Sequence, residues 1–341
     1  HQTCRSNQSR RMADSKRKPP MNEACEIFDI KTEREFERAA LELFREQAEK
    51  CPPYREYLSL IGVNPEEVDE YEKIPHLPIE LFKTHDVYCG DDKPEAVFTS
   101  SATTGMTPSC HPMHSLAHYE RTFRAAFRTF YGEPSRWSLY ALLPNYLRRQ
   151  GSSLVYMADR LIRECGSGGF YLDDCDRLLH DMATDPKPKI LLGVSYALWD
   201  LAEKYAPKLP DTIIMETGGM KGYREELPKE EFHKILCTAF GVQEIHSEYG
   251  MAELTSQAYS AGGNRFRCPA WMRITARDIN DPRDLLPAGT RGGLNVTDLA
   301  NRWSCAFIET QDAGRVFPDG SFEVAGRIDH AEIRGCNLLV Q

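Results

Sequence analysis

Apolar residues recur at helical spacing near the start of the chain. Between residues 28 and 50 they lie three or four positions apart, at Phe36, Ala40, Leu43, Phe44 and Ala48. This spacing predicts an amphipathic helix that ends at the Cys51-Pro52-Pro53 stretch. A second short helix is expected around residues 54–61, and the proline-rich segment 74–87 is expected to be irregular.

Beyond residue 95, apolar runs alternate with helical patterns. Strands are predicted at 96–100, 137–144, 188–195, 211–219 and 242–250, and helices at 118–132, 196–206 and 229–241. Strands separated by helices of about ten or more residues indicate a mostly parallel sheet with crossover helices. Ligands of such sheets bind at the carboxyl ends of the strands.

From about residue 265 the pattern changes to short alternating runs at 271–279, 291–299, 304–312 and 321–329, separated by Gly, Pro and Asp turns. These runs predict a small β-rich subdomain. The expected organisation is a basic tail (1–20), a helical lead-in (21–95), an α/β region (96–264) and a β-rich region (265–341). The predicted fold class is therefore α/β.

Composition narrows the class of protein. The chain has 341 residues, a net charge of −9 and 41% hydrophobic residues, and no apolar run approaches the ~18 residues of a membrane span. The first twenty residues carry six lysines and arginines and one acidic residue, which predicts a disordered extension, with a partner-binding arm as the alternative. Nucleic-acid binding is not expected, because no basic stripe runs through the rest of the chain.

The eleven cysteines are scattered and form no CxxC pair. This pattern argues against a zinc site and against a disulfide framework. Free thiols are typical of a reducing compartment, so a cytoplasmic protein is expected.

A loop rich in hydroxyl groups follows the strand predicted at 96–100. It reads TSSATTGMTPS and contains Ser100, Ser101, Thr103, Thr104 and Gly105. Hydroxyls and backbone N–H groups in such a turn suit a phosphate, although the loop lacks the GK[ST] ending of a Walker motif. The alternative is an ordinary polar surface loop.

Four further motifs lie at predicted strand ends or turns. They are the glycine turn at Gly218 and Gly219, the EYGMAEL segment with Tyr249 and Glu253, the turn at Asp312, and the AGRID segment with Arg327. A carboxylate beside phosphates can bind Mg²⁺, and a guanidinium suits a phosphate. Taken singly, each has a plain structural alternative, such as a left-handed turn or charged residues in solvent.

In this order, the motifs resemble those of the adenylate-forming enzymes, the acyl- and aryl-CoA ligase superfamily. The resemblance covers residues 95–335, and LLPNYLRRQGSSLVYM, ETGGMKG, EYGMAEL and EIRGC are most similar to the LuxE-type acyl-protein synthetases. It implies the N-terminal domain of that fold without the mobile C-terminal domain of larger relatives. It also implies ATP and Mg²⁺, and the activation of a fatty or other carboxylic acid as acyl-adenylate.

The resemblance assigns a role to each motif. The loop Ser101–Gly105 would bind the ATP phosphates, the two glycines would line the adenine pocket, and Tyr249 would stack on adenine. Glu253 would bind Mg²⁺, Asp312 would hold the ribose, and Arg327 would contact ribose or phosphate. Cys336 matches the cysteine that accepts the acyl group for delivery to a partner reductase or acyltransferase.

Cys336 lies in the sequence GRIDHAEIRGCNLLVQ, beside Arg334. Nearby positive charge favours a thiolate, and His330 is a candidate base. Two departures from the superfamily pattern, Ala102 in the loop and Ala252 before Glu253, bear on adenylation. Two alternatives stay open: a ligase that uses coenzyme A or a carrier protein, with Cys336 structural, and a non-catalytic scaffold subunit.

Overall fold

The computed structural model describes residues 26–101, 107–144, 151–220 and 222–328. The predicted basic tail lies outside these ranges, as do Thr103, Thr104, Gly105, His330 and Cys336. Of the helices within them, none is both long and apolar enough to cross a membrane.

The helices follow the predicted periodicity and add two that it did not predict. They are α1 (Glu33–Lys50), α2 (Pro52–Leu60), α3 (Leu116–Tyr131), α4 (Ser153–Cys165), α5 (Cys175–Thr184), α6 (Ser195–Tyr205) and α7 (Lys229–Phe240). Short 3₁₀ helices are η1 (Ile27–Asp29), η2 (Pro65–Glu67), η3 (Tyr71–Lys73), η4 (Ile79–Lys83) and η5 (Pro134–Arg136). Helix α1 begins at a capping box, in which Thr32 and Glu35 satisfy each other's backbone N–H groups.

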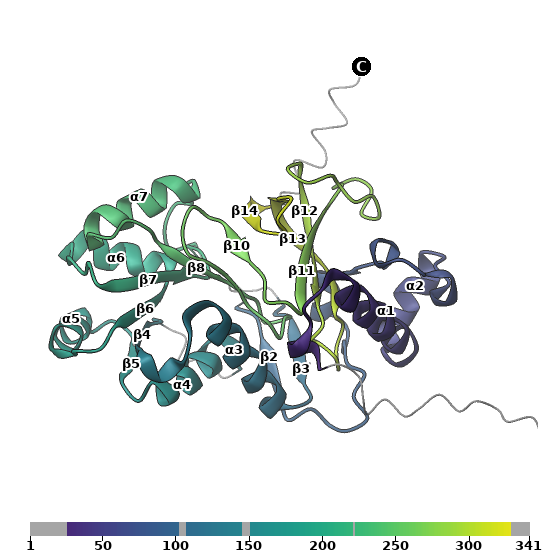
Figure 1. Cartoon of the computed structure of the whole chain (residues 1–341), viewed down its shortest axis with the longest axis horizontal. Helices are drawn as coiled ribbons and strands as arrows, with labels where there is room; N and C mark the ends of the chain where they lie inside the picture. The colour runs from purple at the N-terminus through teal and green to yellow at the C-terminus, as the bar shows by residue number, and fades with distance from the viewer. Residues whose placement is uncertain (1–25, 102–106, 145–150, 221, 329–341) are drawn as a thin grey trace, which may run out of the picture.

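Five strands form the parallel part of the large sheet, in the order β5-β4-β6-β7-β8. They are β4 (Ser138–Leu142), β5 (Gly168–Tyr171), β6 (Lys189–Val194), β7 (Thr212–Thr217) and β8 (His246–Tyr249). Helices α6 and α7 cover one face of these strands, and α3 and α4 cover the other (Figure 1). The order reverses between β4 and β6, which is where open α/β sheets bind ligands.

The same sheet continues through antiparallel strands in the order β8-β9-β10-β14-β13-β12-β11. These are β9 (Ala258–Ser260), β10 (Phe266–Arg267), β11 (Met272–Arg277), β12 (Arg291–Asp298), β13 (Phe307–Val316) and β14 (Phe322–Arg327). A two-residue strand, β1 (Leu77–Pro78), pairs in parallel with β13. In Figure 1, β10 lies between the parallel strands and the β11–β14 region, which packs beside α1 and α2.

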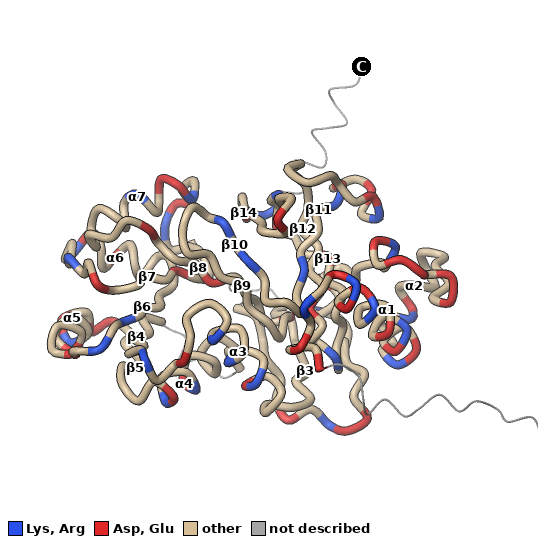
Figure 2. The backbone as a smooth tube through the Cα atoms, in the orientation of Figure 1, with Lys and Arg blue, Asp and Glu red and all other residues tan. Residues whose placement is uncertain are grey.

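Strands β2 (Ala96–Thr99) and β3 (Cys110–Met113) form a separate antiparallel pair. This pair flanks the hydroxyl-rich loop, as the strand predicted at 96–100 implied. Acidic and basic residues are interspersed over α1, α2 and α7 (Figure 2).

Candidate functional site

The parallel strands end together on one edge of the sheet, called here the carboxyl edge. Ser195 follows β6, Gly218 follows β7, and Gly250 follows β8. Parallel strands point the same way, so these turns gather at one place. Among the described residues, the glycine turn at Gly218 and Gly219 and the strand end at Tyr249 lie at this edge.

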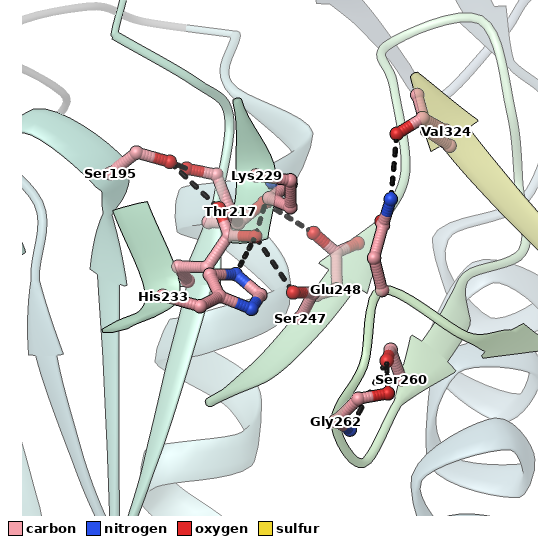
Figure 3. Close-up of polar contacts among 11 residues, drawn as sticks. Ser195, Thr217, Lys229, His233, Ser247, Glu248, Ser260, Gly262 and Val324 are labelled. Carbon is pink, nitrogen blue, oxygen red and sulfur yellow. Dashed lines mark hydrogen bonds and ion pairs between the residues drawn. The ribbon is translucent and has the colours of Figure 1, made fainter. Parts of the chain in front are cut away.

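A buried carboxylate, Glu216 near the end of β7, ties three strand ends and α7 together. Its oxygens accept hydrogen bonds from Ser195 Oγ at 2.7 Å, Ser247 Oγ at 2.7 Å and Lys229 Nζ at 2.5 Å, and His233 Nε2 lies 3.3 Å away. Figure 3 shows these four side chains converging from α6, β8 and α7. Burial alone would raise the pKa of Glu216, but the charge of Lys229 and the hydrogen bonds hold it well below its usual range. The network fixes the position of the turn that follows β7.

On the opposite face of the sheet, Glu248 has a different environment. Thr217 Oγ1 donates a 2.6 Å hydrogen bond to Glu248 Oε2. Burial raises the pKa of Glu248 to about 7, against the effect of this hydrogen bond and with the charge of Glu216 adding to the rise. The two carboxyls lie on adjacent strands, yet the surroundings of Glu216 favour its ionised form and those of Glu248 favour its protonated form.

The glycine turn after β7 has the left-handed backbone that glycine favours, with φ of +75° at Gly218 and +69° at Gly219. A Cβ at Gly219 would meet no heavy atom within 4 Å, within the part of the chain that the structure describes. The described residues therefore leave the side-chain position of Gly219 free, which is what a flat ring lying against the backbone there requires.

Tyr249, Asp312 and Arg327 come together although they are far apart in the sequence. Tyr249 donates a 2.7 Å hydrogen bond to Asp312 Oδ2, and Asp312 is the register partner of Arg327 across β13 and β14. Burial raises the pKa of Asp312, against the Tyr249 hydrogen bond and the charges of Arg327 and Arg277. The tyrosine ring is 8% exposed and packs edge-on against Phe266 and Phe322.

Glu253 lies beside the base of the hydroxyl-rich loop. The loop is closed by two hydrogen bonds: Ser109 N donates to Ser100 Oγ at 2.9 Å and Ser100 N donates to Ser109 O at 3.1 Å. Burial raises the pKa of Glu253, while a hydrogen bond from Ser109 and the charges of Arg327 and Lys83 oppose the rise. Ser101, at the start of the loop, is exposed.

The backbone around Glu253 is held by residues that sequence reasoning missed. Asn301 Nδ2 donates to Glu253 O at 2.9 Å, and His111 Nδ1 lies 2.7 Å from Ala252 O. Asn301 also binds His111 through its side-chain oxygen, at 2.9 Å. The two residues are 190 positions apart, so no local pattern connects them.

The donor set is compatible with Mg²⁺. A magnesium ion takes one or two carboxylates together with substrate phosphates, and Glu253 supplies one carboxylate at the loop base. Among the described residues no group of three or more His, Cys, Asp or Glu side chains forms a protein-only metal cage. The arrangement therefore suits an ion shared with phosphate.

The described cysteines are free thiols. Burial raises the pKa of Cys51 to about 11, and that of Cys89 to about 12. Such thiols are structural fillers, since a thiol with a raised pKa is a poor nucleophile at neutral pH.

The architecture confirms the α/β fold class expected from the sequence, and a solved CoA ligase shares this fold. Among solved structures, the chain is similar to 2-hydroxyisobutyryl-CoA ligase in an open conformation, in complex with 2-HIB-AMP and CoA. The TM-score is 0.65 at 15% identity, over 87% of this chain and 70% of that one.

The chain is also similar to ATP-bound MatB from Rhodopseudomonas palustris, with a TM-score of 0.51 at 17% identity over 70% of this chain. An ATP-bound RpMatB-BxBclM chimera gives a TM-score of 0.54 at 17% identity. The chain spans about half the length of these two, 49% and 48%. No protein-family model matches the sequence, and no curated protein matches it significantly. At these identities the likeness concerns the fold.

Proposed function

We propose that this chain activates a carboxylic acid with ATP. The acid carboxylate attacks the α-phosphorus, the bond to the β-phosphate breaks, and acyl-adenylate and pyrophosphate are formed. The proposal is carried by one observation: the loop base at Ser109, the Tyr249–Asp312 pair and Arg327 all lie around Glu253 or the adjacent strand end.

Each part of the site has a task in this reaction. The open turn at Gly218 and Gly219 takes the adenine, with Tyr249 beside it, and Asp312 accepts hydrogen bonds from ribose hydroxyls. Ser100, Ser101 and the loop that follows hold the phosphates, and Arg327 offers them a fixed fork of donors. Glu253 would hold Mg²⁺, which neutralises phosphate charge when bound.

The test is ATP–pyrophosphate exchange with a panel of acids, fatty acids included. Exchange that depends on one class of acid supports the proposal and identifies the substrate. A folded protein that gives no exchange with any acid favours the scaffold alternative, which the substitutions at Ala102 and Ala252 also suggest.

We further propose that the activated acyl group passes to the thiol of Cys336. The thiolate attacks the acyl carbonyl and AMP leaves, so a thioester replaces the mixed anhydride. His330 would take the thiol proton, and the thioester would be delivered to a partner reductase or acyltransferase. The support is the sequence resemblance, because both residues lie outside the described residues.

Labelling with radioactive acid and ATP separates this step from transfer to coenzyme A. A hydroxylamine-labile label on denatured wild-type protein, absent from Cys336→Ser, is expected. Equal labelling of the two proteins contradicts the proposal. Transfer to added coenzyme A with no protein label supports the second candidate, which matches the presence of CoA in the 2-hydroxyisobutyryl-CoA ligase complex.

A further inference from the structure

The proline-rich segment 74–87, expected to be an irregular connection, runs into the site. Its strand β1 pairs with β13 at Leu77↔Ile308 and Pro78↔Glu309, and η4 follows at once. Since β13 also carries Asp312, the segment lies alongside a strand that builds the candidate nucleotide site.

Helix η4 is fixed on two sides. The Glu80 carboxylate accepts a hydrogen bond from Gln311, the neighbour of Asp312. Phe82 is 1% exposed and packs edge-on against the His111 ring, and His111 in turn binds Ala252 O. The helix therefore bridges the neighbour of Asp312 and the neighbour of Glu253.

Lys83 is the last residue of η4 and is half-buried. Its charge acts on the Glu253 carboxylate, as does the charge of Arg327. Within the part of the chain that the structure describes, the Lys83 ammonium forms no hydrogen bond or ion pair. A cation is thus held near a buried carboxylate without being bound to it.

A substrate polyphosphate explains this arrangement. Phosphates bound above Ser109 would lie next to Glu253, which η4 approaches through Phe82 and His111 and on which the charge of Lys83 acts. The loop itself has no lysine between Pro108 and the end of β3. A flexible ammonium is well suited to phosphate as a point charge.

We infer that Lys83 binds the phosphates of the nucleotide, so that the helical lead-in contributes a ligand-binding side chain to the site. The inference rests on the proposed function and names the group that would recognise the phosphate charge. It also assigns a role to a segment that the sequence motifs left without one.

The experiment measures binding of ATP and of adenosine by calorimetry to the full chain, without any acid. For Lys83→Met the dissociation constant for ATP is expected to rise about tenfold or more, equivalent to about 1.4 kcal/mol. The affinity for adenosine, which lacks phosphates, is expected to stay within about twofold of wild type. Lys83→Arg, which keeps the charge, is expected to retain most of the ATP affinity. Lys234→Met on the exposed face of α7 removes the same charge away from the site and is the matched control.

Three results would overturn the inference. ATP binding to Lys83→Met that equals wild type means that the phosphates do not meet this side chain. Equal weakening of ATP and adenosine binding means that the substitution loosens η4 instead. Unchanged ATP binding with a raised KM for the acid in pyrophosphate exchange assigns Lys83 to the acid carboxylate. If wild-type protein binds neither ATP nor adenosine, the proposed function itself fails. This outcome differs from a failure of the inference alone, in which wild-type protein binds ATP and the Lys83 variants contradict the expected pattern.

Discussion

Glu253 combines burial with the nearby positive charges of Arg327 and Lys83. Burial raises its pKa, so the ionised form is costly unless a positive charge lies close by. Glu253 would hold Mg²⁺ in the proposed function, and the charge of the ion would offset this cost. In the proposed function, the same carboxylate would be a weakened acid in the free protein and a Mg²⁺ ligand once ATP is bound.

Replacing this carboxylate by an amide tests that role. Glu253→Gln is expected to slow pyrophosphate exchange about 100-fold, because a neutral oxygen is a poor ligand for a hard dication. Wild-type exchange at limiting Mg²⁺ should rise with pH as Glu253 ionises, and the variant should lose this limb of the profile. An unchanged profile in Glu253→Gln would place the metal ligand elsewhere. Thermal unfolding of both proteins serves as the control for folding.

Glu248 gives a stability prediction, because its pKa is raised from 4.5 to about 7. Below pH 4.5 the carboxyl is protonated in both the folded and the unfolded chain and has no effect on unfolding. Between pH 4.5 and 7 only the unfolded chain ionises freely, so the native state loses stability as pH rises. Above pH 7 the loss is complete, at about 3 kcal/mol.

Glu248→Gln removes the ionisation and keeps an acceptor for Thr217. The variant is expected to be more stable than wild type at pH 8 and to lose that advantage by pH 4.5, in urea unfolding followed by circular dichroism. Glu230→Gln, an exposed site on α7, should shift little between the two pH values. A constant difference between Glu248→Gln and wild type at all pH values would contradict the assignment.

At the scale of elements, the Glu216 network joins α6, α7, β7 and β8. Lys229→Met leaves Glu216 buried at 2% exposure with neutral or weakly charged donors, so a loss of about 2–3 kcal/mol in unfolding free energy is expected. Urea unfolding measures it. Lys234→Met, five positions further along the same helix, has no such partner and is expected to change stability by less than about 0.5 kcal/mol. Equal effects of the two substitutions would mean that the pair does not hold the helix.

Periodicity was enough to predict α1, α3, α6 and α7, because each has a continuous apolar stripe, and α3 and α7 end at glycine. Helices α4 and α5 and the glycine-containing strand β5 were not predicted. The four-residue β5 offers too short an apolar run to be distinguished from a turn. Tyr249 and Asp312 were singled out from their motifs, and the structure brings them together, but their role in a nucleotide site stays a prediction. The partners of Glu216 could not be named in advance, because they come from three different elements, α6, α7 and β8.

At the scale of the whole molecule, one hydrogen-bonded path connects the parallel strands to the antiparallel ones. Sequence patterns predicted a change near residue 265, from strands alternating with helices to short strands alone. They could not show that β9, β10 and β14 continue the same sheet across this point. Pairing between strands that are distant in the chain leaves no local signature. The division into an α/β region and a β-rich region remains a prediction about sequence organisation.

This continuity predicts that the two halves unfold together. Trp137 and Trp199 report on the parallel part, while Trp271 and Trp303 lie near the other strands. Two single-tryptophan variants are needed, one with its tryptophan in each half. They are expected to give coincident urea transitions by fluorescence. Midpoints that differ by more than about 0.5 M urea would indicate two units that unfold separately.

The pairing of β1 with β13 has a consequence for biosynthesis. Leu77 pairs with Ile308, which is translated about 230 residues later, so strand β1 cannot form before then. The parallel strands β4–β8 are translated in between, and chains fold broadly from the N-terminus as they emerge from the ribosome. The segment that contains η4 can therefore take its place beside β13 only after β13 has been translated. A nascent chain that is stalled before β13 would lack Asp312 and the strand that pairs with β1, so the proposed nucleotide site would be incomplete.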